Sequence, residues 1–87
     1  MIHLTHTPRF KKRFDFLSEK IKEKVMKRLD IFIRDEYNVI LNNHQLHGEY
    51  SGCRSINVTG DIRIIYEKIE NDRCCLLDIG THNQLYE

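Results

Sequence analysis

The sequence has no long hydrophobic run, and at 87 residues it is short. No stretch approaches the roughly 20 apolar residues that a membrane-spanning helix needs. The first six residues, MIHLTH, are too few and too polar for a signal peptide. Repeats and low-complexity segments are also missing, and a chain of this length holds one hydrophobic core. We therefore expect one domain, residues 1–87, in a soluble cytoplasmic protein with no membrane partner.

Cysteine is scarce, with only Cys53, Cys74 and Cys75. An odd number cannot pair completely, and neighbouring residues of a strand point to opposite faces, so a bridge between Cys74 and Cys75 is geometrically poor. This favours a reducing compartment and thiols that fill core volume over a redox role. His44 and His47 have the spacing His-x-x-His, but no second ligand pair accompanies them. We expect neither a metal nor a cofactor.

The net charge is only +1, but the charges are unevenly distributed. Residues 1–34 carry ten Lys or Arg against four Asp or Glu, a net charge of +6, while the remainder carries four against nine, a net charge of −5. This asymmetry favours a polyanion or an acidic partner for the first part of the chain. A solvated helix face explains the same pattern equally well.

The hydrophobic pattern predicts a strand, two helices and three further strands. Residues 2–5 alternate as an opening strand. Thr7 and Pro8 form the start of a helix that runs to about Leu17, and Ser18 caps a second helix that ends near Arg34. Residues 35–52 are polar and irregular, so we expect a connecting loop. Strands at residues 54–58, 61–67 and 74–79 follow, separated by short turns.

This order predicts an α+β fold, in which a two-helix hairpin packs on one face of a mainly antiparallel four-stranded sheet. Alternation along residues 61–67 gives the strand two different faces. The face under the helices is apolar, with Ile62, Ile64 and Tyr66. The other face, which we expect to be polar and open, has Asp61, Arg63, Ile65 and Glu67. Asn57 should lie near Asp61 on the open side, where His82 also emerges.

Four segments resemble the RelE/ParE-type bacterial toxin superfamily, and within it the YafQ-like branch of messenger-RNA interferases. They are HQLHG at 44–48, GCRSI at 52–56, DIRIIY at 61–66 and GTHNQLY at 80–86. The resemblance implies a RelE-like fold of order β-α-α-β-β-β and the toxin of a type II toxin-antitoxin system. Such a toxin is a ribosome-dependent endoribonuclease that cuts messenger RNA and so inhibits translation. Its cognate antitoxin holds it inactive in a hetero-oligomer.

The resemblance also implies roles for individual residues. His82 matches the family's C-terminal histidine, a proton donor, and His44 matches the histidine of the loop before the sheet. Asp61 matches the acidic residue after the first hairpin turn, and Tyr86 matches an aromatic near the terminus. Asn57 departs from the pattern, because the YafQ-like branch has another histidine there. This departure predicts lower activity, or proton transfer that depends on His44 and His82.

Cleavage of RNA through its own 2′-hydroxyl needs a base, a cation for the phosphorane and an acid for the leaving oxygen. Histidine suits the proton transfers because its ordinary pKa of about 6.5 makes both forms accessible near neutrality. We expect His82 as the acid, His44 or Asp61 as the base, and Arg63 as the cation, without a metal. Taken without the resemblance, Arg63 is better explained by an exposed ion pair with Asp61 or Glu67 than by catalysis.

A second group of residues is expected to bind the RNA rather than to cut it. Tyr86 either stacks on a base or packs against the sheet. Lys11 and Lys12 are expected to contact phosphates, including those of ribosomal RNA. The substrate-binding set is Tyr86, Arg54, Asn57, Lys11 and Lys12. Two other interpretations remain open: a ParE-like inhibitor of DNA gyrase, which would not need His82, and a degenerate toxin that only binds its antitoxin.

Overall fold

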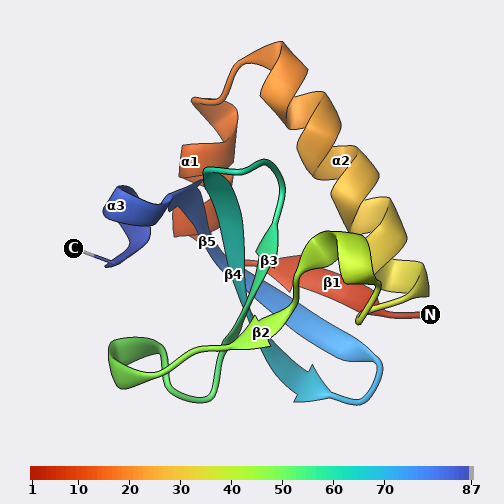
Figure 1. The fold of residues 1–87 in the computed structure, drawn as a ribbon. Helices are drawn as coiled ribbons and strands as arrows, with labels where there is room; N and C mark the ends of the chain where they lie inside the picture. The colour runs from red at the N-terminus through yellow and green to blue at the C-terminus, as the bar shows by residue number, and fades with distance from the viewer. Residues whose placement is uncertain (87) are drawn as a thin grey trace.

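A five-stranded mixed sheet forms the centre of the molecule, and two helices cover one of its faces (Figure 1). The structure is a computed structural model that describes residues 1–86. The chain order is β1 His3–His6, α1 Pro8–Asp15, α2 Glu19–Arg34, β2 His44–Gln45, β3 Arg54–Asn57, β4 Ile62–Glu70, β5 Arg73–Thr81 and α3 His82–Tyr86. Two 3-10 helices, η1 Val39–Leu41 and η2 Gly48–Tyr50, flank β2.

The strands lie side by side in the order β1-β5-β4-β3-β2. β1 is parallel to β5, and the other three pairs are antiparallel. The expected four-stranded sheet was therefore wrong by one strand. His44 and Gln45, which we assigned to the connecting loop, pair with Ser55 and Arg54. Two residues are too few to show the alternation that reveals a strand in a sequence.

The predicted helix starts are confirmed. The Thr7 hydroxyl oxygen accepts the Phe10 N–H at 3.1 Å, with Pro8 at the first helical position. Ser18 caps α2 in the same way, through the Ile21 N–H at 3.2 Å. The Thr7 hydroxyl also donates to the Leu77 carbonyl at 2.7 Å. One threonine thus caps α1 and fastens it to β5.

The main hydrophobic core lies between the two helices and the sheet. Its centre combines α2 with β3, β4 and β5 through Val25, Phe32, Ile56, Ile64, Tyr66 and Ile79. The rings of Phe32 and Tyr66 meet edge to face with their centroids 4.7 Å apart. As predicted, Ile62, Ile64 and Tyr66 lie on the helix side of β4.

A second, smaller core covers the other side of the sheet, which we expected to be open. Ile65 is fully buried there against Leu46 from the segment after β2, Cys53, and Leu85 from α3. Burying each of these aliphatic side chains contributes about 1.5–3 kcal/mol, so the loop and the C-terminal helix fold over the sheet. The expectation of an open polar face was wrong because it ignored the apolar residues of segments distant in the sequence.

The buried cysteines are consistent with a core-filling role. Cys53 lies in the second core and Cys74 in the main core, and both are free thiols. Burial raises the pKa of Cys74 to about 11 and also raises the pKa of Cys53, so both stay protonated and unreactive near neutrality. Cys75 is half-buried. No helix within residues 1–86 combines the length and the apolar character that a membrane crossing requires.

Candidate active site

A pocket of about 290 Å³ lies where the β2 segment meets the start of α3. Its lining includes His44, Arg63 and His82, three of the four side chains that we assigned to catalysis, together with Tyr86. These residues come from β2, β4 and α3, which are far apart in the sequence. Gln45, Leu46 and His47 complete the wall. The structure thus brings two imidazoles, a guanidinium and a phenol to one solvent-accessible site.

Asp61 does not join this group. It lies in the turn before β4, is exposed, and its backbone N–H donates to the Thr59 hydroxyl at 3.2 Å. The expectation that Asp61 shares a strand face with Arg63 was wrong, because the strand begins only at Ile62. The register of the β3–β4 hairpin places Asn57 opposite Arg63 instead. Of the two candidate bases, only His44 lines the pocket.

A reciprocal pair of hydrogen bonds positions His82. The Gln84 side-chain oxygen accepts the Thr81 N–H at 2.8 Å, and the Thr81 hydroxyl accepts the Gln84 N–H at 3.2 Å. This is a capping box, which satisfies free N–H groups at a helix start. His82 is the first residue of the helix that the box begins. The run Gly-Thr-His-Asn-Gln therefore encodes a short helix with its histidine at a fixed place.

Gly80 is required for this arrangement. A Cβ atom at this position would lie 2.7 Å from the Gln84 side-chain oxygen and 3.1 Å from Nη1 of Arg13. Real Cβ atoms do not come within 3.0 Å of another heavy atom, so a larger residue would displace Gln84. Glycine allows the Gln84 side chain to fold back over the backbone and reach Thr81.

The His82 ring lies beside Tyr86, which in turn contacts Tyr50. The rings of His82 and Tyr86, one helical turn apart on α3, have centroids 4.8 Å apart. Tyr50 from η2 meets Tyr86 edge to face at 6.0 Å. Tyr86 is half-buried against the second core, so it both packs on the sheet side and lines the pocket. Tyr86 thus connects the exposed His82 ring to the second core.

The backbone fixes the tautomer of His44. Its Nδ1 lies 2.9 Å from the Asn42 carbonyl oxygen, and a carbonyl only accepts, so Nδ1 carries the proton in the neutral ring. Nε2 is then left without a proton, as a general base requires. Asn42 itself adopts a left-handed conformation with φ 47°. This turn directs its carbonyl toward the imidazole two residues later.

Arg63 and Asn57 carry unsatisfied polar atoms beside the pocket. Nε of Arg63 and the side-chain oxygen of Asn57 are both buried without a hydrogen-bond partner within the described chain. No carboxylate of residues 1–86 lies within 4.0 Å of Arg63, so the ion pair with Asp61 or Glu67 that we considered does not form. A guanidinium without an internal partner is suited to an external anion such as a phosphate.

Arg54, in contrast, belongs to a polar network on the helix side of the sheet. Its Nε donates to the Asn43 side-chain oxygen at 2.7 Å, and its guanidinium lies 5.3 Å from the centre of the Tyr37 ring. Asn43 in turn donates to the Tyr66 hydroxyl at 2.7 Å, and this hydroxyl donates to Glu36 at 2.7 Å. The structure therefore does not bring Arg54 to the pocket.

Glu36 is the buried anion of this network. Burial by itself would raise its pKa, but hydrogen bonds from Lys68 at 2.8 Å and from Tyr66, together with the charge of Lys68, hold the pKa of Glu36 below its usual range. For Tyr66, burial and the neighbouring Glu36 carboxylate raise the pKa far above its ordinary value. Both groups therefore keep their hydrogen-bonding forms at neutral pH and connect the middle of β4 to the segment after α2.

Lys11 and Lys12 lie on α1, away from the pocket. Lys11 forms an ion pair with Asp15 at 2.8 Å, and its hydrogen bond is the main reason that the pKa of Asp15 is lowered. Lys12 instead lines a separate hollow on α1. The sequence analysis treated Lys11 and Lys12 alike, but in the structure Lys11 is paired with a carboxylate and Lys12 lines a hollow.

Sequence reasoning missed the residues that hold the site together. Gln84 had a readable signal, since Thr-x-x-Gln is the capping-box pattern. Asn42 and Tyr50 had none, because their roles depend on distant contacts or on a single backbone conformation. Within residues 1–86, no three His, Cys, Asp or Glu side chains come together as a metal-binding group.

Comparison with known proteins places the chain in a family. A family model described as "Bacterial toxin of type II toxin-antitoxin system, YafQ" matches residues 2–87. Comparison with curated protein sequences gave no match. Among solved structures, the chain is similar to the crystal structure of YafQ from E. coli strain BL21(DE3), with 16% identity, 100% of both chains covered and a TM-score of 0.83.

Two structures of complexes are also similar. For the E. coli DinJ-YafQ toxin-antitoxin complex, the identity is 19%, with 99% of this chain and 98% of that chain covered and a TM-score of 0.80. For the YoeB-YefM complex from Staphylococcus aureus, the identity is 15%, with 94% and 98% covered and a TM-score of 0.77. These structures support the fold, and the family model spans almost the whole sequence. The chain therefore belongs to the YafQ family of toxins of bacterial type II toxin-antitoxin systems.

Proposed function

We propose that this chain is an endoribonuclease that cuts messenger RNA on the ribosome, without a metal, and thereby inhibits translation. One observation carries the proposal: His44, Arg63 and His82 line a single pocket although they come from three separate elements. An acid, a base and a fixed cation are the groups that cleavage through the 2′-hydroxyl needs.

In the proposed reaction, the unprotonated Nε2 of His44 takes the proton of the 2′-hydroxyl. The 2′-oxygen then attacks the adjacent phosphorus, and Arg63 stabilises the charge on the phosphorane oxygens. The bond from phosphorus to the 5′-oxygen breaks, and His82 gives its proton to that oxygen. The products are a 2′,3′-cyclic phosphate and a 5′-hydroxyl, and no water is consumed.

Asn57 has a supporting role in this proposal. Asn57 lies opposite Arg63 in the hairpin, and its amide offers hydrogen bonds to the substrate where the resemblance implies an imidazole. An amide does not transfer protons near neutral pH, so His44 and His82 supply both proton transfers. Tyr86 stacks on a base next to the scissile linkage.

The test compares single variants on programmed ribosomes and on naked message, with cut sites mapped. We expect His82→Ala and His44→Ala each to lower cutting by about 100-fold or more, since general acid–base groups contribute roughly that much. Asp61→Asn and His3→Ala, both exposed and outside the pocket, are matched controls that should cut normally. Excess chelator should leave cutting unchanged.

Other outcomes would contradict the proposal. Growth arrest by His82→Ala equal to that of the parent chain would favour the gyrase-inhibitor interpretation instead. Activity that chelator abolishes and zinc restores would contradict metal independence. Cutting of naked message at the same rate as ribosome-bound message would contradict ribosome dependence.

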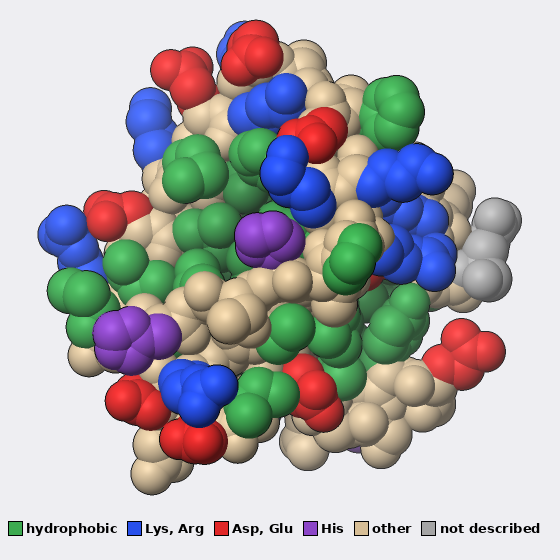
Figure 2. All heavy atoms as spheres, turned by 180° about the vertical axis from the view of Figure 1, so that it is seen from behind, with side chains coloured by type: hydrophobic (Ala, Val, Ile, Leu, Met, Phe, Trp, Pro, Cys, Tyr) green, Lys and Arg blue, Asp and Glu red, His purple; other side chains and the backbone are tan. Residues whose placement is uncertain are grey.

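We further propose that a cognate antitoxin binds this toxin in a hetero-oligomer. Two similar structures are the DinJ-YafQ and YoeB-YefM complexes. The surface offers a groove for such a partner on the helix side of β1, lined by apolar side chains that include Leu4, Phe10, Met26 and Leu29. Figure 2, the view from behind, shows apolar side chains gathered near the middle of this face and Lys and Arg side chains beside them.

An amphipathic, acidic segment that folds on docking fits this surface. The test is co-purification with the product of a small open reading frame beside the toxin gene. Met26→Asp, at an exposed position of the groove, should weaken the complex, while Val39→Asp at an exposed position outside it should not. Equal binding by both variants would show that the antitoxin docks elsewhere.

A further inference from the structure

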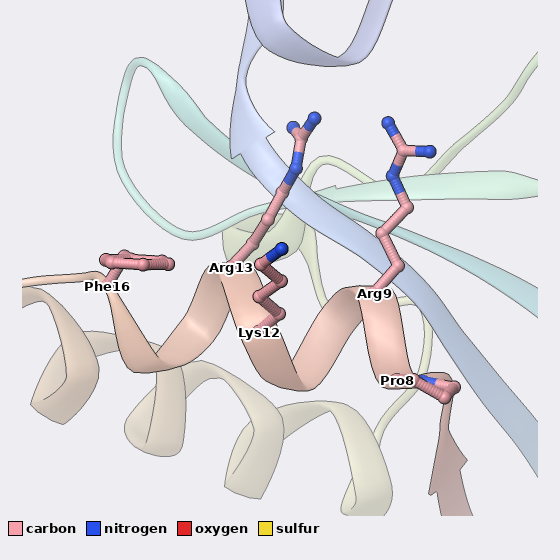
Figure 3. A pocket seen from close by; sticks show the side chains of 5 residues that line it. All are labelled: Pro8, Arg9, Lys12, Arg13 and Phe16. Carbon is pink, nitrogen blue, oxygen red and sulfur yellow. The ribbon is translucent and has the colours of Figure 1, made fainter.

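A hollow of about 510 Å³ on α1 lies apart from the candidate active site. It is lined by Pro8, Arg9, Lys12, Arg13 and Phe16 (Figure 3). Three of these five side chains are cations and one is aromatic. Figure 3 shows that the Arg9 and Arg13 side chains leave the helix in the same direction, toward β5. Nothing in the proposed reaction uses this group of residues.

A buried carboxylate holds the two arginines in place. Asp78 on β5 is only 2% exposed, and its oxygens lie 3.0 Å from Nε of Arg9 and 3.5 Å from Nε of Arg13. One of these oxygens also accepts the Ile79 N–H at 2.8 Å. The ion pairs with Asp78 are made through Nε of each arginine, and Nη1 of Arg13 is buried without a partner within residues 1–86. The Arg9 side chain is 65% exposed and that of Arg13 28%, so Arg9 presents the more accessible guanidinium.

Lys12 and Phe16 complete the lining of the hollow. No carboxylate of the described chain forms an ion pair with Lys12, unlike its neighbour Lys11, which is paired with Asp15. Phe16 is 82% exposed at the C-terminal end of α1, so its ring faces water rather than the core. Three cations against the single Asp78 carboxylate leave the hollow with a net positive charge of two.

The hollow is continuous with the surface around α3. A neighbouring hollow of about 260 Å³ shares Arg13 and Phe16 with it and reaches Gly80 and Gln84. Gln84 is two residues from His82 and belongs to the same helix. α1 and α3 cover opposite faces of the sheet, but Figure 1 shows them near the same end of it, where both lie beside β5. A nucleic-acid strand with one linkage at His82 can therefore run back along this path to α1.

We propose that the hollow on α1 is a second RNA-binding subsite, in which Arg9, Lys12 and Arg13 bind backbone phosphate and Phe16 stacks on the adjoining base. The inference rests on the proposed function and extends it. Guanidinium groups bind two phosphate oxygens at once, and an exposed aromatic ring stacks on any base. Phosphate contacts and base stacking are the two components by which proteins bind single strands without sequence preference.

The test uses the full chain and a labelled RNA oligonucleotide whose 2′-hydroxyls are methylated, so that it binds but cannot be cut. Lys12→Ala and Phe16→Ala are suitable variants because neither side chain supports the fold. We expect Phe16→Ala to weaken binding about tenfold. Lys12→Ala should weaken binding and reduce the slope of log affinity against log salt by about 0.7. Lys24→Ala, at an exposed lysine of α2 that does not line the hollow, and Val39→Ala are matched controls that should bind normally.

The same variants are then measured on programmed ribosomes, which separates two sources of phosphate. Loss of binding to both oligonucleotide and ribosome assigns the subsite to the message, and loss on the ribosome alone assigns it to ribosomal RNA. Unchanged binding of both variants to both ligands would overturn the subsite, even if message is cut. If binding depends on Lys12 and Phe16 but no RNA is cut, the subsite stands and the nuclease proposal fails.

Discussion

Replacing Gly80 by alanine should lower the rate of message cutting much more than it lowers the free energy of unfolding. The new methyl group would meet the Gln84 side-chain oxygen at 2.7 Å, so Gln84 must leave the Thr81 N–H. Losing a capping interaction costs about 1–2 kcal/mol, and the lower entropy of the unfolded alanine chain offsets about 0.5 kcal/mol. The free energy of unfolding should therefore fall by only about 1 kcal/mol, since Leu85 still anchors α3 in the second core.

Activity should fall much further. His82 begins the helix that the capping box starts, and a misplacement of about 1 Å can lower a rate by about 100-fold. The assay pairs urea denaturation with message cutting on programmed ribosomes, for Gly80→Ala, Gln84→Ala and the double variant. Because both single changes break the same hydrogen bond, the double variant should lose less than the sum of the two. Additive losses, or full activity in Gly80→Ala, would refute the reasoning.

Three other changes probe the packing and the charges. Leu85→Ala, at a position only 4% exposed, should lower the free energy of unfolding by about 2–4 kcal/mol in urea denaturation, whereas Ile69→Ala, half exposed, should change it by less than about 0.5 kcal/mol. Tyr66→Phe should cost about 1–3 kcal/mol in the same measurement, because Glu36 loses a buried donor. Since the folded-state pKa of Glu36 is lowered, its contribution is complete above its unfolded pKa of about 4.3 and is lost as the pH falls through the folded value. Thermal unfolding should therefore show acid destabilisation below about pH 4.5 that is weaker in Glu36→Gln; identical pH profiles would contradict this.

Local signals in the sequence were sufficient to predict the two long helices and the long strands. Thr7 with Pro8 and Ser18 fixed the helix starts because a cap depends only on residues within one turn. β2 was not predicted because its two residues are too few to show an alternation of polar and apolar side chains. Asp61 was assigned to a strand because alternation extends by one residue into the turn that precedes β4.

The site was predictable only in part, for a similar reason. The resemblance pointed to His44 and His82, and the chemistry of RNA cleavage pointed to Arg63. No local rule, however, states that the segment after β2 and α3 pack against the same side of the sheet. That arrangement depends on Leu46 and Leu85, which meet Ile65 across the second core. The hollow on α1 could not be predicted from local signals either, because it depends on contacts between distant residues. Asp78, which forms ion pairs with Arg9 and Arg13, follows them by more than 60 residues.

The parallel pairing of β1 with β5 has a consequence for the order of folding. Residues 3–6 pair with residues 73–76, and Thr7 reaches Leu77 across a separation of 70 residues. Contacts this distant in the chain form late and slow the folding of small domains. The candidate pocket, in contrast, is lined by β2, β4 and α3, which the antiparallel pairs β2–β3, β3–β4 and β4–β5 join through contacts nearer in the chain. The sheet around the candidate site should therefore form before the N-terminal strand closes against β5.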